Sequence, residues 1–412
     1  MFYHSLLHRR QFRYLGAFYL HSIIRSFAIS LFQLFNGIFI FQLARNYGFE
    51  FHQSLSIVAF SLALIHIFNS LSAAPSVWLI AKKGLRFAVL WGNLSLVAFY
   101  VILSLAKYDL IFLFIATFFG GAAIGLYWTA YHLYFSHLSD DKKQGEEISI
   151  GSLLASIASI GGPAFGGLLI NFLGFEALFV VLAILVLVAT IPLQYLPKQE
   201  DKIEVHLLKI IMTLSPKREW KTFLTLGGIA FTDEVAVVFL PIFFLPFLSG
   251  IIGVGFIGSV LAFFAMVMTF IVGFMIDRFG PKRVINVIAP LDAITWVISV
   301  FITSASHIFL LSPLYALNRS AQNISVDTAI YQHGRHQDIV AAIFQREIGM
   351  AIMRWTLFLV WGILFWFNMP LVLIFLFTAL VSLLTKLYPY KTDTDKAKIN
   401  LFKNDRPDNI TS

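Results

Sequence analysis

Residues 273–283 read GFMIDRFGPKR, a charged turn between two long apolar runs. Residues 81–86 read AKKGLR and occupy the same setting nearer the start of the chain. Superposing Gly280 on Gly84 gives an offset of 196 residues, close to half of the 412-residue chain. The sequence therefore predicts two related halves, each with a basic turn between its second and third apolar run.

The composition indicates a membrane protein. Apolar residues make up 58% of the chain and charged residues 13%, whereas a soluble domain carries about 25% charged residues. The 44 Phe residues are spread through nearly every apolar run. This distribution is typical of helices whose outer faces meet lipid.

The apolar runs have the length of membrane-spanning helices, which need about 20 mostly apolar residues. They are long and continuous, unlike the short alternating strands of a barrel. They lie near residues 14–44, 53–80, 86–106, 110–136, 147–172, 175–196, 222–248, 252–276, 283–304, 308–331, 346–367 and 370–388. We expect an all-α integral membrane protein with twelve transmembrane helices.

The polar segments divide these helices into two pseudo-symmetric six-helix bundles. Residues 1–196 form the predicted N-terminal bundle and residues 222–390 the C-terminal bundle. Residues 197–221, rich in Lys, Glu and Asp, form a cytoplasmic linker between them. Residues 391–412 form a charged cytoplasmic tail.

Basic residues collect on one side of the predicted membrane. Of the 30 Lys and Arg residues, 25 fall in the predicted cytoplasmic segments, and only Arg45 and Lys107 fall in outside loops. This asymmetry places both termini in the cytoplasm of a multi-pass protein, which we assign to the plasma (inner) membrane of a bacterium. Topology thereby explains the net charge of +8, and no nucleic-acid partner is expected.

Several kinds of chemistry are not expected from this sequence. The chain has no Cys, so it has no disulfide framework, thiolate metal site or cysteine nucleophile. No phosphate-binding loop, nucleophile elbow or zinc-protease motif is found. His333 and His336 lie three apart without nearby convergent acids, so no metal is predicted. We therefore expect no enzyme activity, no cofactor and no ATP-driven pumping by the chain itself.

The turn at residues 273–283, set in a six-plus-six chain with a basic linker, resembles the major facilitator superfamily. In that family this loop forms a cytoplasmic charge latch. The resemblance assigns Asp277, Arg278 and Arg283 to such a gate, with Gly280 in its turn. In the first-half copy Ala81 replaces the acid, so a symmetrical latch is not expected.

A second resemblance lies at residues 161–167, which read GGPAFGG. The pattern is similar to the Gly-Pro-x-x-Gly-Gly signature of the family's proton-coupled drug exporters, although Ala158 replaces its preceding glycine. Small residues also let helices approach closely, and Pro bends a span. Helix packing is the simpler interpretation of the four residues concerned, which are Gly162, Pro163, Gly166 and Gly167.

Four charges fall midway through predicted spans, where an ionisable group costs about 2.5–3.5 kcal/mol on insertion scales. They are Arg25, Asp233, Glu234 and Arg319. The resemblance places them on helices that line a central cavity. One of the two acids is then a candidate proton-coupling site, or else a fixed salt bridge to Arg25 or Arg319 holds the two halves together. The arginines are candidate clamps for an anionic or zwitterionic substrate.

Residues 127–132 read YWTAYH at the end of the fourth predicted span. Tyr127 and Tyr131 share one helix face, and Trp128 and His132 share another. An aromatic wall with a titratable His, in which we single out Tyr131 and His132, is suited to a ring-bearing or cationic substrate. An aromatic belt at the membrane interface is the competing interpretation.

The sequence thus predicts a secondary active transporter that moves a small solute by alternating access and is coupled to protons. The signature at residues 161–167 favours export. An importer of an anionic or zwitterionic metabolite and a non-transporting membrane scaffold or sensor are the alternatives. The expected partners are a small-molecule substrate, protons and the lipid bilayer, and the protein is expected to act as a monomer.

The predicted topology can be tested by cysteine labelling, because the chain has no Cys of its own. Lys107→Cys should react with a membrane-impermeant maleimide in intact cells. Lys282→Cys should react only after the membrane is opened, since basic turns stay cytoplasmic. Labelling of Lys282→Cys in intact cells would contradict this orientation.

Overall fold

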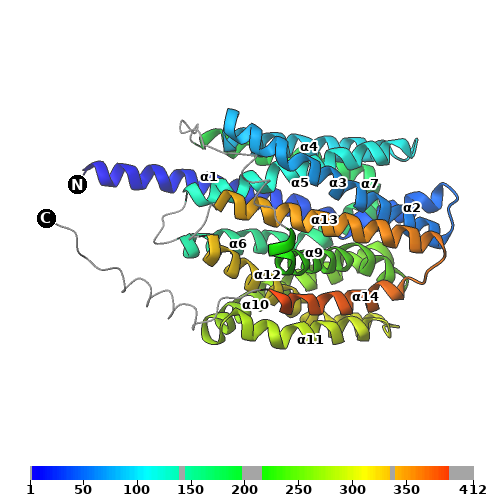
Figure 1. Ribbon diagram of the computed structural model, residues 1–412. Coiled ribbons are helices and arrows are strands. Elements are labelled where there is room, and N and C mark those ends of the chain that lie inside the picture. Colours follow the sequence, from blue (N-terminus) through cyan, green and yellow to red (C-terminus); the bar gives the residue numbers. More distant parts are fainter. Residues whose placement is uncertain (1, 139–143, 197–215, 335–338, 389–412) are drawn as a thin grey trace.

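The computed structural model describes residues 2–138, 144–196, 216–334 and 339–388, and these residues form helices without strands (Figure 1). The first helices are α1 (Phe2–Phe32), α2 (Phe35–Asn46), α3 (Phe51–Lys83), α4 (Leu85–Leu105), α5 (Ile111–Leu138), α6 (Gln144–Ile160), α7 (Gly162–Thr190) and the 3₁₀ helix η1 (Ile191–Tyr195). The remaining helices are α9 (Pro216–Phe244), η2 (Leu245–Phe247), α10 (Gly250–Phe279), α11 (Pro281–Ser299), α12 (Ala305–Gly334), α13 (Ile339–Trp366), α14 (Val372–Ser382) and η3 (Leu383–Leu387). Most of the predicted linker and the whole tail lie outside the described residues.

Eight stretches of the described chain are long and apolar enough to cross a membrane. One of them, Leu153–Tyr195, contains the fifth and sixth predicted spans together, because helix continues on both sides of Gly174. Three further predicted spans coincide with α11, α12 and Val372–Leu387. The first two carry more polar residues, and the third is short. The all-helical membrane class predicted from the sequence is confirmed.

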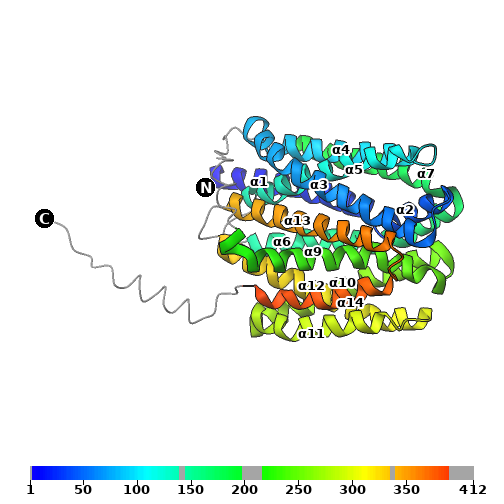
Figure 2. The same cartoon turned by 45° about the vertical axis from the view of Figure 1, so that its right-hand side comes forward.

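The helices run side by side along one direction (Figures 1 and 2). Helices α3, α4, α5 and α7 lie in the upper part of both views, and α10, α11, α12 and α14 lie in the lower part. Between these groups, α13 packs along α3 and α10 packs along α7. Segments far apart in the sequence therefore meet along the middle of the molecule.

The helix predicted over residues 147–172 is interrupted in the structure, since α6 ends at Ile160 and α7 begins at Gly162. Pro163 occupies the first turn of α7, where its missing N–H costs no helical hydrogen bond. Gly174 has φ 81° and ψ 173°, which turns the chain between the fifth and sixth predicted spans. Gly161, the one residue between α6 and α7, keeps helical angles of φ −74° and ψ −22°, so the helix bends at the Gly-Pro segment.

The two turns that the sequence pairs with each other have the same backbone shape. Gly84, between α3 and α4, has φ 87° and ψ 166°. Gly280, between α10 and α11, has φ 78° and ψ 152°. A positive φ is readily adopted only by glycine, which explains why both copies of the turn keep this residue while the charges around it differ.

Glycines of α7 bring this helix against α1. A Cβ added to Gly162 would overlap Oγ of Ser30, and one added to Gly166 would overlap the carbonyl oxygen of Leu31. Neither position has room for a side chain. The two helices therefore touch through backbone.

An adjacent face of α7, about 100° round the helix, meets α10 in the same way. A Cβ on Gly167 would lie 3.0 Å from the carbonyl oxygen of Ile251, and one on Gly255 would lie 2.5 Å from that of Pro163. Close backbone approach through small residues is how helices associate where lipid supplies no hydrophobic driving force. The GGPAFGG segment thus sits in a tight contact between the first and second parts of the chain.

This packing predicts a large effect of a single methyl group. Gly166→Ala should lower the thermal unfolding midpoint of the detergent-purified protein, because overpacking of this kind costs about 1–3 kcal/mol. The matched control is Gly273→Ala in α10, where an added Cβ meets nothing within 4 Å. Equal midpoints for the two variants would contradict the close contact of α7 with α1.

Candidate functional site

Two adjoining cavities lie between the helices. The larger has a volume of about 360 Å³ and the smaller about 210 Å³. The larger one falls within the size range of small-molecule sites. Asp233 of α9 and Arg319 of α12 line both cavities, so this pair of charges stands where the two spaces meet.

Asp233 is neutralised from α12. Its Oδ1 lies 3.0 Å from Nε of Arg319, and its Oδ2 accepts a hydrogen bond of 3.1 Å from Nδ2 of Asn323. Both partners come from the second half of the chain. The predicted salt bridge to Arg319 is therefore present, but it lies within one half of the chain and does not hold the two halves together.

Glu234 makes the contact that does reach across the halves. Its Oε2 lies 3.6 Å from Nε of Arg354 on α13 and 3.7 Å from Nε2 of His66 on α3. Nε of Arg354 also donates a 3.0 Å hydrogen bond to the carbonyl oxygen of Ala230. Adjacent helix positions point about 100° apart, which explains why Asp233 and Glu234 have separate partners.

Arg25 of α1 is held by the first half of the chain. It is 6% exposed, and its Nε donates a 3.0 Å hydrogen bond to Oδ1 of Asn93 on α4. Its guanidinium carbon lies 3.3 Å from the ring centroid of Tyr127 on α5. Among the described residues no carboxylate forms a salt bridge with it. The alternative of a bridge from Arg25 to the α9 acids is therefore wrong, because Asn93 and Tyr127 occupy it instead.

The predicted aromatic wall is divided between two roles. Tyr127 is 2% exposed and stacks on Tyr131 at 5.4 Å, while Tyr131 also stacks on Phe18 at 4.9 Å. Trp128 lines the larger cavity. The His132 side chain lies outside the described residues. Tyr127 thus supports Arg25, whereas Tyr131 is partly buried and packs against Tyr127 and Phe18. The choice between an aromatic wall and an interfacial belt stays a prediction.

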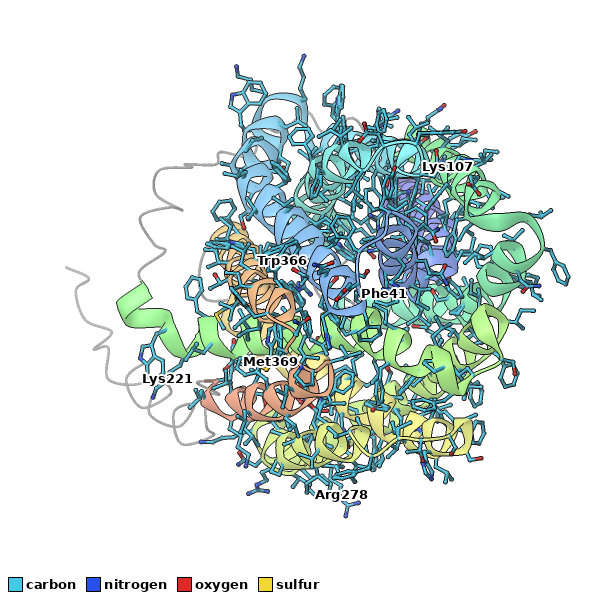
Figure 3. All side chains as sticks on the ribbon, turned by 90° about the vertical axis from the view of Figure 1, so that its right-hand side faces the viewer. Phe41, Lys107, Lys221, Arg278, Trp366 and Met369 are labelled. Carbon is cyan, nitrogen blue, oxygen red and sulfur yellow. The ribbon has the colours of Figure 1, made fainter. Side chains whose placement is uncertain are left out.

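The predicted gate residues lie on the surface. Asp277, Arg278 and Arg283 are exposed around the turn at Gly280, and the Arg278 side chain points outward in Figure 3. Within the described parts of the chain none of these three forms a salt bridge. The latch assigned to them by the resemblance stays a prediction.

Three residues of the site were not predicted as site residues. His66 was one polar residue in an apolar span, and Arg354 and Asp292 lie on helices outside the predicted cavity-lining set. Asp292 of α11 lines the larger cavity and accepts a 2.6 Å hydrogen bond from Nε2 of Gln322. The one signal in the sequence for His66, Arg354 and Asp292 is that each is an ionisable residue inside a predicted span. No group of three or more His, Asp or Glu in the described residues is placed to hold a metal ion.

Membrane-length helices arranged around paired charges and a cavity of solute size define a membrane transport protein. The sequence matches the family model of the Major Facilitator Superfamily over residues 25–345. This match covers most of the chain, and the protein belongs to that family. The predicted family is confirmed, and so is the prediction that the chain is not an enzyme, since this is a family of transporters.

Solved structures of transporters share this fold. A D-xylose–proton symporter superposes with a TM-score of 0.71 at 13% identity, over 92% of this chain and 99% of that one. A POT family transporter in complex with 5-aminolevulinic acid gives 0.67 at 15%, over 90% and 94%. An auto-inhibited POT family peptide transporter gives 0.71 at 10%, over 97% and 98%. No curated protein matches the sequence.

The pairing of Asp233 with Arg319 can be measured by a double-mutant cycle. Each single variant, Asp233→Asn or Arg319→Gln, leaves one charge unpaired, whereas the double variant removes both. The Arg319 side chain is 45% exposed, so solvent screens the pair and we expect a coupling free energy of about 1 kcal/mol. Thermal unfolding in detergent gives the values. Strictly additive single effects would contradict the pairing.

Proposed function

We propose that the protein is a secondary active transporter that moves a small solute by alternating access and is coupled to protons. Family membership, the solute-sized cavity and the ionisable groups beside it support this function. The absence of a nucleotide-binding motif from the sequence leaves an ion gradient as the source of energy.

The proposed architecture has twelve spans in two six-helix bundles, residues 1–196 and 222–390, joined by the linker at 197–221. Both termini face the cytoplasm, and the protein works as a monomer in the plasma (inner) membrane of a bacterium. Alternating access is then a rocking of one bundle against the other around the central cavity. Helix α7 packs against α10, and α3 packs against α13. In the proposed motion the two bundles move against each other at these contacts.

The observation that carries the proposal is the position of the Glu234 carboxylate. It stands between Arg354 of its own bundle and His66 of the other bundle, at 3.6 and 3.7 Å. Both separations exceed the length of a good N–H···O hydrogen bond. The carboxylate is therefore shared between the two bundles and committed to neither.

A proton in this group changes the attraction between the bundles. With neutral His66, the charge of Glu234 is balanced by Arg354 alone, and α3 gains little from its contact with α9. A proton on His66 places a second cation on the opposite bundle and draws α3 towards α9. A proton on Glu234 removes the attraction altogether. Because the groups interact, they take up and release protons as one coupled unit.

The Asp233–Arg319 pair is the proposed link between solute and proton. It stands at the junction of the two cavities, and Glu234 follows Asp233 directly in the chain. A charged solute in the larger cavity lies beside this pair, because Asp233 and Arg319 both line that cavity. Solute binding in the larger cavity in this way changes the electrostatic environment of Glu234, which lines the smaller cavity.

Export is the proposed direction, on the resemblance of residues 161–167 to the exporter signature. Uptake of an anionic or zwitterionic solute is the second candidate. It is favoured by the arginines that line the cavity, Arg25 and Arg319, and the similar POT family transporter was solved with 5-aminolevulinic acid.

Proton coupling predicts a split phenotype for Glu234→Gln. Proteoliposomes with an internal pH-sensitive dye are supplied with a panel of anionic and zwitterionic solutes, including 5-aminolevulinic acid. The variant should lose at least tenfold in gradient-driven transport, because the amide neither takes up nor releases a proton. Exchange of radiolabelled solute across the membrane, which needs no proton transfer, should continue.

The matched control is Glu176→Gln. The exposed carboxylate of Glu176 lies 2.9 Å from Nζ of Lys107, and it lines neither cavity. This variant should keep both activities. Unchanged gradient-driven transport by Glu234→Gln would rule out Glu234 as the coupling carboxylate.

A further inference from the structure

The charges that line the larger cavity are not all balanced by one another. Asp233 and Arg319 neutralise each other at 3.0 Å. The other two are Arg25 on α1 and Asp292 on α11, and neither forms a salt bridge within the described residues. One cation and one anion, from opposite halves of the chain, are thus left facing the same space.

The Arg25 end is built to hold an anionic group. The Tyr127 ring covers one face of the guanidinium, and Nε is committed to Asn93. This arrangement fixes the plane of the side chain, which lines the cavity. A guanidinium fork fits a carboxylate through two parallel hydrogen bonds.

The Asp292 end is built to hold an ammonium group. The carboxyl is 3% exposed, and the rings of Trp296 and Tyr315 line the cavity beside it, edge to face at 5.8 Å and 72°. Tyr315 is in turn hydrogen-bonded to Ser299. A carboxylate next to aromatic rings is the combination that binds ammonium ions, through charge and through cation–π attraction.

Asn318 packs against Asp292 but is not among the residues that line the cavity. It donates from Nδ2 to Oγ1 of Thr295 at 3.0 Å. Its Oδ1 is buried and accepts no hydrogen bond from the described residues. Asp292 already accepts hydrogen bonds from Gln322 and Asn318, but no cation balances its charge within the described residues. An ammonium group in the cavity, which Asp292 lines, supplies that balance.

We infer that the larger cavity binds a zwitterion, with its anionic group on the Arg25 guanidinium and its ammonium group against the Asp292 carboxyl. This inference rests on the proposed transport function and names its class of solute. Apolar side chains line the space as well and suit a hydrocarbon chain between the two charged groups. They include Val237, Leu240 and Leu261.

Electrostatics favours a zwitterion over a singly charged solute. A buried charge without a partner is costly, and removing one partner of a buried pair is strongly destabilising. A simple anion would satisfy Arg25 and leave Asp292 unbalanced, and a simple cation would do the reverse. A solute that carries both charges balances both ends at once and connects α1 with α11.

The experiment uses ω-amino acids, from glycine to 6-aminohexanoate, as a ruler for the distance between the two ends. Binding to the full-length protein in detergent is measured by calorimetry, with the N-acetyl and methyl-ester form of each compound beside it. We expect one chain length to bind best. Either cap should weaken its binding at least tenfold, which corresponds to about 1.4 kcal/mol.

Two variants assign the ends. Asp292→Asn should abolish the penalty for N-acetylation and keep the penalty for esterification, whereas Arg25→Gln should do the opposite. Each variant is compared with itself on paired ligands, so a general loss of stability does not imitate the result. The matched control, Asp109→Asn, changes an exposed acid in the α4–α5 connection and should keep both penalties.

Several results would overturn the inference. Equal binding of capped and uncapped compounds to the wild type is one, and this test needs no variant. A second is an Asp292→Asn protein that keeps the N-acetylation penalty, because this result would show that the Asp292 carboxyl does not bind the ammonium group.

Failure of the transport function would look different. If another solute moves protons while no ω-amino acid binds, the transporter stands and the zwitterion is wrong. If ω-amino acids bind with the expected cap penalties while no solute moves protons, the binding site stands and the coupled transport is wrong.

Discussion

The cost of placing charge in a low-dielectric interior is the constraint on which the rest of this structure depends. An ionisable side chain in the middle of a membrane-spanning helix has no water to solvate it, so it needs a partner of opposite charge or a strong hydrogen bond. Here the partners come from other helices, often more than a hundred residues away, as for Glu234 with Arg354 and His66. The packing of the helices and the balance of charge are therefore one problem.

The charges are balanced in three ways, and each suits a different part of a transport cycle. Asp233 and Arg319 are paired within one half of the chain, in a contact that survives motion of that half as a unit. Glu234 lies between Arg354 and His66 from the two parts of the chain, so in the proposed alternating-access cycle its charge balance would change. Arg25 and Asp292 line the larger cavity without a salt bridge in the described residues, and the proposed zwitterion would complete them. A fold that paired every charge internally would be more stable, but it would offer a solute nothing to bind.

Glycine contacts supply the second constraint, because lipid gives helices no hydrophobic reason to associate. Helix α7 touches α1 through Gly162 and Gly166, with backbone against backbone. On an adjacent face it meets α10, where Gly167 of α7 lies against Ile251 and Gly255 of α10 lies against Pro163. A smooth contact between small residues allows neighbouring helices to slide or rock without the loss of interlocked side chains. The position of Pro163 at the start of α7 places this contact at the wall of the larger cavity.

The sequence by itself determined the all-helical membrane class and the family, because hydropathy, the length of the apolar runs and a turn motif are local properties. It also singled out Asp233, Glu234 and Arg319 as costly charges. Only the tertiary structure decided which acid meets which base. That choice depends on how each helix is rotated about its axis and on which distant helix packs against it, and spacing along one chain encodes neither. For the same reason Asp292 reads as one more buried acid in the sequence and becomes part of a binding cavity only when α11 packs beside α12.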